Sequence, residues 1–215
     1  MVGNDVVDLL DPESDPSTLS PRFDQRVFTA AEREDIARSK DSRSERWCRW
    51  AAKEAVFKLA RKLDPRVIFS PVRFEVKLSE AASGTNEREG RVTHEGAEHS
   101  IRLWCDHDSV HALSASPLTA ESPLLHGVMR LPADDPELTS PEGPGGLLQR
   151  LAVREIAGAL GISPAALEIR KHRRIPTVYL GGRPADIDLS LSHHGALVAW
   201  AFRVGHAHTQ KRLAS

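Results

Sequence analysis

The chain has 215 residues, enough to bury the core of one domain or of two small ones. Lysine and arginine number 29 against 30 aspartates and glutamates, for a net charge of −1, so the composition argues against a nucleic-acid partner, which would need a basic surface. No apolar run approaches the roughly 18 to 20 residues of a membrane span, so we expect no membrane partner. The N-terminus lacks a basic region followed by an apolar one, and no secretory signal is therefore expected.

The first elements are a short strand and a helix. The apolar run at residues 6–10 predicts a strand with Asp5 at its start. Three prolines within residues 11–22 predict a loop. Thr29 is suited to be the N-cap of a helix reaching to about residue 39, and Glu32 completes a capping box, which gives Glu32 a purely structural explanation.

A long amphipathic helix is predicted for residues 44–63. Its apolar stripe, with spacings of three and four, consists of Cys48, Ala52, Ala55, Leu59 and Leu63. A second stripe consists of Trp47, Ala51, Glu54, Lys58 and Arg61. Glu54 and Lys58 stand at i,i+4, and a surface ion pair between them is the simplest interpretation.

An antiparallel sheet is expected to follow this helix. Residues 72–78 alternate apolar and polar, residues 79–90 form a loop, and a hairpin joins residues 91–94 to residues 100–105. A last strand is predicted at residues 110–114. Cys48 and Cys105, the only cysteines, have no partners at metal-ligand spacing, so we expect buried free thiols in a reducing cytoplasm.

The composition changes at residues 115–146, which contain six prolines and the run 143–146, Gly-Pro-Gly-Gly. This segment predicts a linker or insertion with one short strand at residues 127–131. A helix is predicted at residues 147–160, with Gly161 at its C-cap position. Strands are predicted at residues 167–169, 177–180, 187–191 and 196–204.

Four short motifs together resemble those of the 4′-phosphopantetheinyl transferases. The central helix reads W-x-x-K-E-A-x-x-K from Trp50 to Lys58. Gly3-Asn4-Asp5 resembles the G-x-D segment of that family, and residues 28–32 resemble its F-[ST]-x-x-E segment. Ser190-Leu191-Ser192-His193 resembles its S-x-S-H segment. The resemblance spans residues 3 to 193, with a gap near residues 80 to 145.

The resemblance implies an α+β fold of two related halves, a pseudo-dimer in which each half packs a helix or helix pair on an antiparallel sheet. Residues 1–115 would form one half and residues 147–215 the other, joined by the linker or insertion at 116–146. The second half resembles the first half of the larger, surfactin-synthetase-activating transferases, so the order is swapped here. Residues 110–115 and 197–202 would be equivalent strands, and the active site would lie in the cleft between the halves. The alternative is a single elongated holo-acyl-carrier-protein-synthase fold with an insertion, which would assemble through subunit contacts; the helix at 147–160 favours two halves.

The activity that the resemblance implies is transfer of 4′-phosphopantetheine from coenzyme A to a serine hydroxyl of a carrier protein, with release of adenosine 3′,5′-bisphosphate. Asp5 and Glu54 would hold Mg²⁺, which prefers carboxylate oxygens. Glu54 and Lys58 would be the catalytic residues, with Lys58 contacting the pyrophosphate as a point charge. The larger enzymes carry another acid where this chain has Val7. The general base stays open between Glu54 and a metal-bound hydroxide.

Coenzyme A would be bound mainly by the second half. Ser192 and His193 would meet its 3′-phosphate or adenine side. The dense basic run includes Arg170, Lys171, Arg173 and Arg174, and it is either a phosphate clamp or a solvated loop. The family's G-K-P segment has no clean counterpart, which leaves Arg174 and Arg183 as candidates to replace its lysine.

The expected protein is therefore a cytoplasmic, Mg²⁺-dependent phosphopantetheinyl transferase of the holo-acyl-carrier-protein-synthase type. Its partner would be an acyl or peptidyl carrier protein with an acidic surface near its serine, serving fatty-acid, polyketide or peptide synthesis. One alternative is a degenerate relative that binds coenzyme A or a carrier protein without turnover. Another is a structural α+β interaction domain in which the motifs are coincidental.

Overall fold

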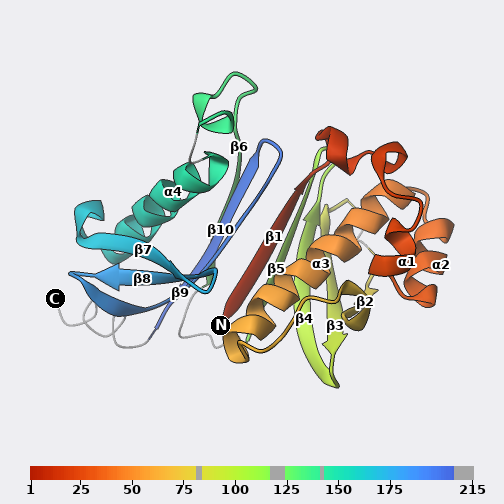
Figure 1. Ribbon diagram of the computed structural model, residues 1–215, viewed down its shortest axis with the longest axis horizontal. Coiled ribbons are helices and arrows are strands. Elements are labelled where there is room, and N and C mark those ends of the chain that lie inside the picture. The colour runs from red at the N-terminus through yellow and green to blue at the C-terminus, as the bar shows by residue number, and fades with distance from the viewer. Residues whose placement is uncertain (81–83, 117–123, 141–142, 206–215) are drawn as a thin grey trace.

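The computed structural model describes residues 1–80, 84–116, 124–140 and 143–205, and these form two five-stranded antiparallel sheets that lie beside each other (Figure 1). Sheet A contains β1 (Val2–Asp8), β2 (Glu75–Leu78), β3 (Glu87–His94), β4 (Ala97–Cys105) and β5 (Ser109–Ala115), in the spatial order β1-β5-β4-β3-β2. Sheet B contains β6 (Leu124–Arg130), β7 (Leu167–His172), β8 (Ile175–Leu180), β9 (Arg183–His194) and β10 (Leu197–Val204), in the order β6-β10-β9-β8-β7. The α-helices are α1 (Phe23–Val27), α2 (Ala30–Arg38), α3 (Ser42–Leu63) and α4 (Gly143–Leu160).

The two halves have the same topology. Each begins with one strand, continues through its helices, and ends in four strands that follow one another across the sheet. The first strand of each half pairs with the last, so β5 and β10 occupy equivalent places. The predicted pseudo-dimeric α+β fold is therefore confirmed, since a single elongated fold with an insertion would not contain two complete sheets of matching order.

Helix α3 packs on sheet A through the predicted apolar stripe. Cys48, Ala52, Ala55 and Leu59 are fully buried. Leu63 was expected to be buried but is 55% exposed, because it is the last residue of α3 and the preceding Lys62 already reaches the first residue of β1. The close approach of α3 to β1 requires glycine at position 3, where an added Cβ would lie 2.1 Å from the carbonyl oxygen of Ala55.

The observed strands are longer than the predicted ones. Strand β1 begins at Val2 rather than residue 6, because it pairs with β5 along its whole length, and Asp5 therefore lies in mid-strand. Strand β3 begins at Glu87, within the predicted loop, whereas β2 begins only at Glu75, after a 3₁₀ turn at Pro71–Arg73. Strand β7 extends to His172, so part of the basic run is strand rather than loop.

The proline-rich segment contributes a strand as well as a connection. The strand predicted at residues 127–131 is observed as β6, which begins three residues earlier and ends one residue earlier, and it pairs with β10 at the edge of sheet B. The helix predicted at residues 147–160 begins at Gly143 and ends at Leu160, before Gly161 with φ of 68°. The division of the chain at residues 115 and 147 stays a prediction.

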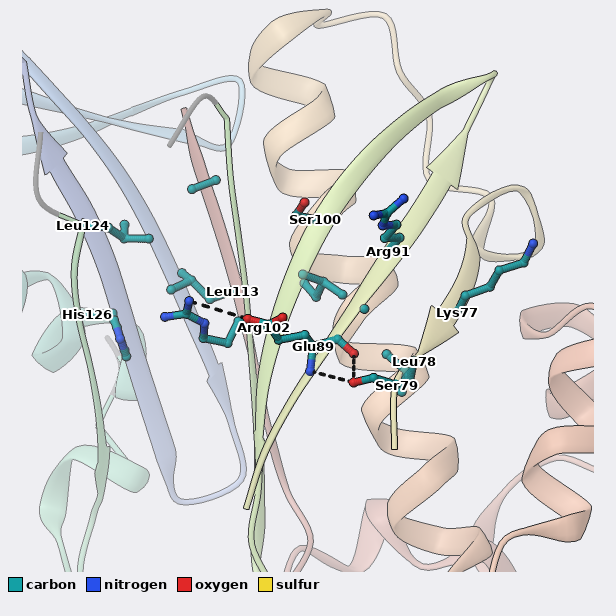
Figure 2. Close-up of a pocket in the computed structure, with 13 residues that line it drawn as sticks. Lys77, Leu78, Ser79, Glu89, Arg91, Ser100, Arg102, Leu113, Leu124 and His126 are labelled. Atoms are coloured by element: carbon teal, nitrogen blue, oxygen red, sulfur yellow. Dashed lines mark hydrogen bonds and ion pairs between the residues drawn. The ribbon is translucent and has the colours of Figure 1, made fainter. Parts of the chain in front are cut away.

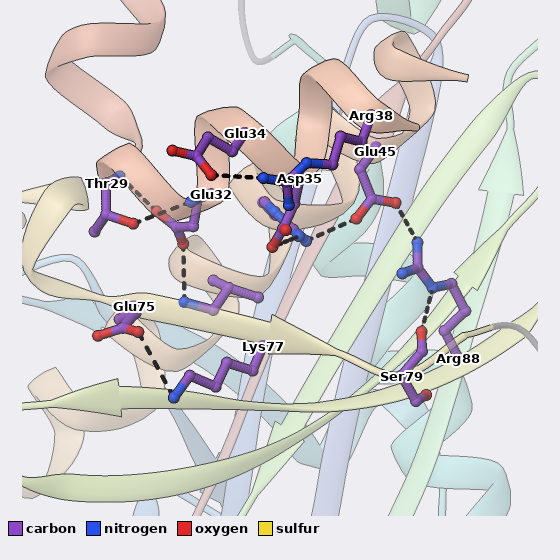
Figure 3. Close-up of polar contacts among 12 residues, drawn as sticks. Thr29, Glu32, Glu34, Asp35, Arg38, Glu45, Glu75, Lys77, Ser79 and Arg88 are labelled. Carbon is purple, nitrogen blue, oxygen red and sulfur yellow. Dashed lines mark hydrogen bonds and ion pairs between the residues drawn. The ribbon is translucent and has the colours of Figure 1, made fainter. Parts of the chain in front are cut away.

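The capping box predicted at Thr29 and Glu32 is present, and Glu32 has further partners (Figure 3). Its carboxylate accepts hydrogen bonds from the backbone N–H of Val76 at 2.8 Å and from the ammonium of Lys53 at 2.9 Å. Lys53 is fully buried and also donates to the carbonyl oxygens of Pro71 and Phe74. These two motif residues therefore hold α2, α3 and the start of β2 together. Breaking such a buried pair typically costs about 3–5 kcal/mol.

The face of sheet A opposite α3 is partly open (Figure 2). It forms a shallow cavity of about 650 Å³ over Arg102 and Leu113, which are paired across β4 and β5. Charged side chains at its rim pair across neighbouring strands, as Arg91 does with Glu98 and Arg102 with Glu87. None of the residues singled out from the sequence for catalysis, metal or coenzyme A binding lines this cavity. Both cysteines are free thiols, and Cys105, expected to be buried, is only half-buried.

Strand β1 forms the junction between the halves. Among the described strands, none pairs with its outer edge. The N–H groups of that edge instead donate to side chains of β9, each 186 residues further along the chain. The four pairs are Val2 with Asp188, Asn4 with Ser190, Val6 with Ser192 and Asp8 with His194. Side chains thus cover an edge that would otherwise be free to pair with another chain. They also fix the position of β9 along β1.

Other contacts of β1 join the same two halves. Val6 packs against Leu197 and Ala199 of β10. Asp8, 2% exposed, forms an ion pair with Arg130 of β6 at 2.9 Å and accepts a hydrogen bond from the backbone N–H of Ala196. The halves therefore meet through both apolar packing and buried charge.

Candidate functional site

A cleft of about 310 Å³ lies between the halves. Strand β1, helix α3 and the end of β9 line it, with Asp5, Val6, Val7, Trp50, Glu54, Lys58 and residues 191–194. Asp5, Glu54, Lys58, Ser192 and His193, which the sequence suggested separately, are thus brought into one place. Glycine at position 3 contributes by letting α3 approach β1 closely.

Asp5 is the most highly connected carboxylate of the cleft. Its Oδ1 accepts hydrogen bonds from Lys58 Nζ at 2.8 Å and from Ser192 Oγ at 2.7 Å. In the described part of the chain, no donor reaches its Oδ2. Lys58 also donates to the carbonyl oxygen of Asn4 at 2.9 Å. The ion pair of Lys58 is therefore with Asp5, and among the described residues none is formed with Glu54.

Glu54 is half-buried and makes no hydrogen bond or ion pair with the rest of the described chain. Burial, followed by repulsion from Asp5, raises the pKa of Glu54 to about 7, against the attraction of Lys58. A half-buried carboxyl group without a partner in the described chain, beside a second carboxylate with one oxygen that accepts no hydrogen bond there, is an unfavourable arrangement that a divalent cation would relieve. Asp5 and Glu54 thus supply two hard oxygen donors of the kind that Mg²⁺ binds, usually with water and substrate oxygens as further ligands.

His193 lies on the second-half side of the cleft. Burial, together with the positive charges of Lys58 and Lys171, lowers the pKa of His193. The first turns of α4 lie beside it, since a Cβ added to Gly145 would be 3.7 Å from His193 Nε2. The N-terminal end of a helix carries unpaired N–H groups and partial positive charge, so this end of the cleft favours an anion.

A groove of about 200 Å³ continues from the cleft, and the two share Lys58 and Leu191. The groove is lined by Phe57, Lys58, Arg61, Lys62, Arg174, Ile175, Pro176, Ser190 and Leu191. Four of these side chains carry positive charge, which suits a ligand with several phosphate groups. The sequence did not suggest Arg61 and Lys62 as residues of a phosphate-binding groove. The available signal was that Lys62 stands four residues after Lys58 on the same helix face.

The other predicted coenzyme A residues lie at varying distances from the groove. Arg173 and Arg174 form the β7–β8 turn, with φ of 50° and 69°, and the carbonyl oxygen of Arg173 accepts from Arg61. Arg170 pairs with Glu168 and lies 4.3 Å from the Tyr179 ring centroid. Arg183 begins β9, at the opposite end of that strand from His193. The structure therefore brings Arg174 to the groove and Lys171 near His193.

A second group of possible metal ligands consists of Asp11, Glu13 and His194, whose ligand atoms lie within 4.8 Å of one another. His194 Nδ1 accepts a hydrogen bond from the backbone N–H of Asp8 at 3.2 Å. A neutral imidazole with Nδ1 as acceptor carries its proton on Nε2, so neither ring nitrogen offers a cation a free lone pair. This group is therefore a poorer candidate for a metal site than Asp5 and Glu54.

The fold and the cleft define a class of protein. Its members have two matching α+β halves, and the cleft between the halves contains two carboxylates, a lysine and a histidine. Residues 1–115, more than half of the chain, match the family model of the 4′-phosphopantetheinyl transferase superfamily. The chain belongs to that superfamily. No curated protein matches the chain. Among the helices of the described ranges, none has the length and apolar character needed to cross a membrane.

Proposed function

We propose that this protein transfers 4′-phosphopantetheine from coenzyme A to a serine hydroxyl of an acyl or peptidyl carrier protein, and that it requires Mg²⁺. Membership of the superfamily supports phosphopantetheinyl transfer in general. The observation that carries the proposal is the meeting of Asp5, Glu54 and Lys58 from the first half with His193 from the second in one cleft.

In this proposal Asp5 and Glu54 hold the cation. Bound Mg²⁺ would neutralise negative charge on the pyrophosphate of coenzyme A. Lys58, held by Asp5 at 2.8 Å, contributes a fixed positive charge next to the same group. The serine hydroxyl gives its proton to a base, either Glu54 or hydroxide, and its oxygen forms a bond to the phosphorus that carries pantetheine. The bond from that phosphorus to the bridging oxygen breaks, and adenosine 3′,5′-bisphosphate leaves with that oxygen.

The groove provides the remaining phosphate contacts. Arg61 and Arg174 line it, and His193 lies where the cleft and α4 meet, so these residues are the proposed contacts of the 3′-phosphate. Cations at the mouth of the site also favour a carrier protein with acidic residues around its serine. A reaction that consumes coenzyme A is consistent with the proposed cytoplasmic location.

The test is the intact mass of apo-acyl carrier protein after incubation with this protein, coenzyme A and Mg²⁺. We expect a gain of one phosphopantetheine group, which EDTA abolishes and excess Mg²⁺ restores. The substitution Glu54→Gln should abolish the gain, whereas Glu75→Gln, an exposed change on β2, should not. Apo carriers from fatty-acid, polyketide and peptide synthesis should be compared.

Calorimetric binding of coenzyme A separates the remaining outcomes. Binding without transfer to any of these carriers would replace the proposal with a protein that binds coenzyme A without turnover. If the protein neither binds coenzyme A nor transfers phosphopantetheine, the proposal is overturned and an interaction domain is favoured.

A further inference from the structure

Ser192 has a more specific place in the site than the motif suggests. Its side chain is buried, and the residue is 7% exposed. Its hydroxyl donates to Asp5 Oδ1 at 2.7 Å and accepts from the backbone N–H of Val6 at 3.3 Å. The hydroxyl thus connects the second half directly to a carboxylate of the first.

A serine hydroxyl has one proton to donate. In Ser192 that proton is used by Asp5, so the hydroxyl cannot at the same time donate to a phosphate oxygen, which needs a donor. The predicted contact between Ser192 and the 3′-phosphate of coenzyme A therefore conflicts with the observed hydrogen bond. His193, the next residue along the strand, keeps its own place on the cleft.

The hydrogen bond also determines which oxygen of Asp5 is free. Ser192 and Lys58 both donate to Oδ1, from different halves of the protein, and together they fix the carboxylate. Oδ2, without a donor in the described part of the chain, is left for a cation shared with Glu54. Donors that hold a metal-binding carboxylate in this way commonly change metal affinity by 10- to 100-fold.

We propose that Ser192 is a positioning residue of the divalent-metal site, which orients Asp5 for the cation and makes metal binding depend on the docking of the second half. This inference rests on the proposed function, because it requires a cation at Asp5 and Glu54. It assigns the S-x-S-H serine to the metal and leaves the phosphate to His193 and the cations of the groove.

Ser190 offers a matched control on the same strand. Its hydroxyl accepts from the backbone N–H of Asn4 at 2.9 Å, as Ser192 does from Val6, and it is also buried. In the described residues it makes no hydrogen bond with Asp5. Ser190→Ala therefore removes the same covering of the β1 edge without removing the hydrogen bond to the carboxylate.

The experiment measures binding of Mn²⁺ alone, by electron paramagnetic resonance of the free ion, to the full chain without coenzyme A. Ser192→Ala should weaken the binding of Mn²⁺ by about 10-fold or more. Ser192→Thr, which keeps the hydroxyl, and Ser190→Ala should both bind Mn²⁺ within about threefold of the wild-type affinity. Thermal unfolding of each variant confirms that it is folded. Ser192→Ala and Ser190→Ala should lose similar stability, so a difference in Mn²⁺ affinity reports the contact with Asp5.

Binding of coenzyme A and of dephospho-coenzyme A in EDTA provides the second measurement. Ser192→Ala should bind both as wild type does. A selective loss for coenzyme A would assign Ser192 to the 3′-phosphate and overturn the inference. Equal Mn²⁺ affinity for wild type and Ser192→Ala would also overturn it while leaving the proposed function in place. If wild type binds no Mn²⁺, both the inference and the proposed metal site fail, although mass-spectrometric transfer activity is still tested separately.

Discussion

Replacing Glu54 by glutamine should make the metal-free protein more stable at neutral and alkaline pH. The Glu54 carboxyl is half-buried, has no hydrogen-bond partner in the described chain, and faces the negative charge of Asp5. A neutral amide of nearly the same shape removes that repulsion. The substitution should also abolish transfer, because it removes a proposed metal ligand. Gain of stability with loss of function is typical of residues kept for activity.

The size of the effect follows from the pKa of Glu54, which is raised from 4.5 to about 7. A carboxyl group with a raised pKa in the folded state destabilises the fold when it ionises, so the penalty is small below pH 4.5, grows as the pH rises, and is complete above pH 7. Each pKa unit corresponds to about 1.4 kcal/mol, which sets an upper limit of roughly 3 kcal/mol. Because the group is only half-buried, we expect about 1–3 kcal/mol at pH 8 and less than about 1 kcal/mol at pH 5.

The assay is urea unfolding in EDTA at pH 8 and pH 5. Glu45→Gln is the matched control, the same substitution on the same helix. Glu45 forms ion pairs with Arg49 at 2.8 Å and with Arg88 at 2.6 Å, so its loss should destabilise the protein (Figure 3). A Glu54→Gln variant less stable than wild type at pH 8 would refute the reasoning, as would a gain that does not shrink at pH 5.

Two further substitutions test the contact between β5 and β6 and the packing of α3. His111 of β5 is buried, its ring stacks on that of Trp104, and it lies 5.5 Å from the ring of His126 on β6. Burial lowers the pKa of His111 from 6.5 to about 3, so the unfolded chain takes up a proton below pH 6.5 that the folded protein cannot, and stability is lost as the pH falls. When the pH is lowered from 7 to 5, the free energy of unfolding in urea should therefore fall by about 2 kcal/mol more in wild type than in His111→Phe. The control His107→Phe, at an exposed position, should lose as much as wild type. An equal loss in His111→Phe and wild type would contradict the prediction. Gly3→Ala should cost about 1–3 kcal/mol or more, because its Cβ would lie 2.1 Å from the Ala55 carbonyl oxygen. The control is Gly158→Ala, whose added Cβ would meet no described atom outside its own helix within 4 Å and which should stabilise α4 by up to about 1 kcal/mol. An unchanged urea midpoint for Gly3→Ala would show that α3 is free to move away from β1.

Local patterns in the sequence determined much of the fold. The spacing of apolar residues identified α3 and α4, and Thr29 with Glu32 identified the start of α2. The hairpin between β3 and β4 turns at Glu95 and Gly96, both with positive φ, as expected of such a turn. These features are readable because they depend on residues within a few positions of one another.

The matching halves were predictable for a different reason. The motifs and the second helix together indicated a pseudo-dimer, and the sheet orders agree with it. The assignment of Asp5, Glu54 and Lys58 to one site also came from the motifs. The structure adds their neighbours in the cleft.

Only the tertiary structure decided which partner each polar side chain has. Helix spacing suggested that Lys58 pairs with Glu54, but β1 brings Asp5 to Lys58 and leaves Glu54 without a partner in the described chain. Likewise Ser192 donates to Asp5, a residue 187 positions away. Spacing along a helix or strand determines which face a side chain occupies, whereas the group it meets there depends on how distant segments pack. That packing is set by the burial of β1 between the halves, which no local pattern encodes.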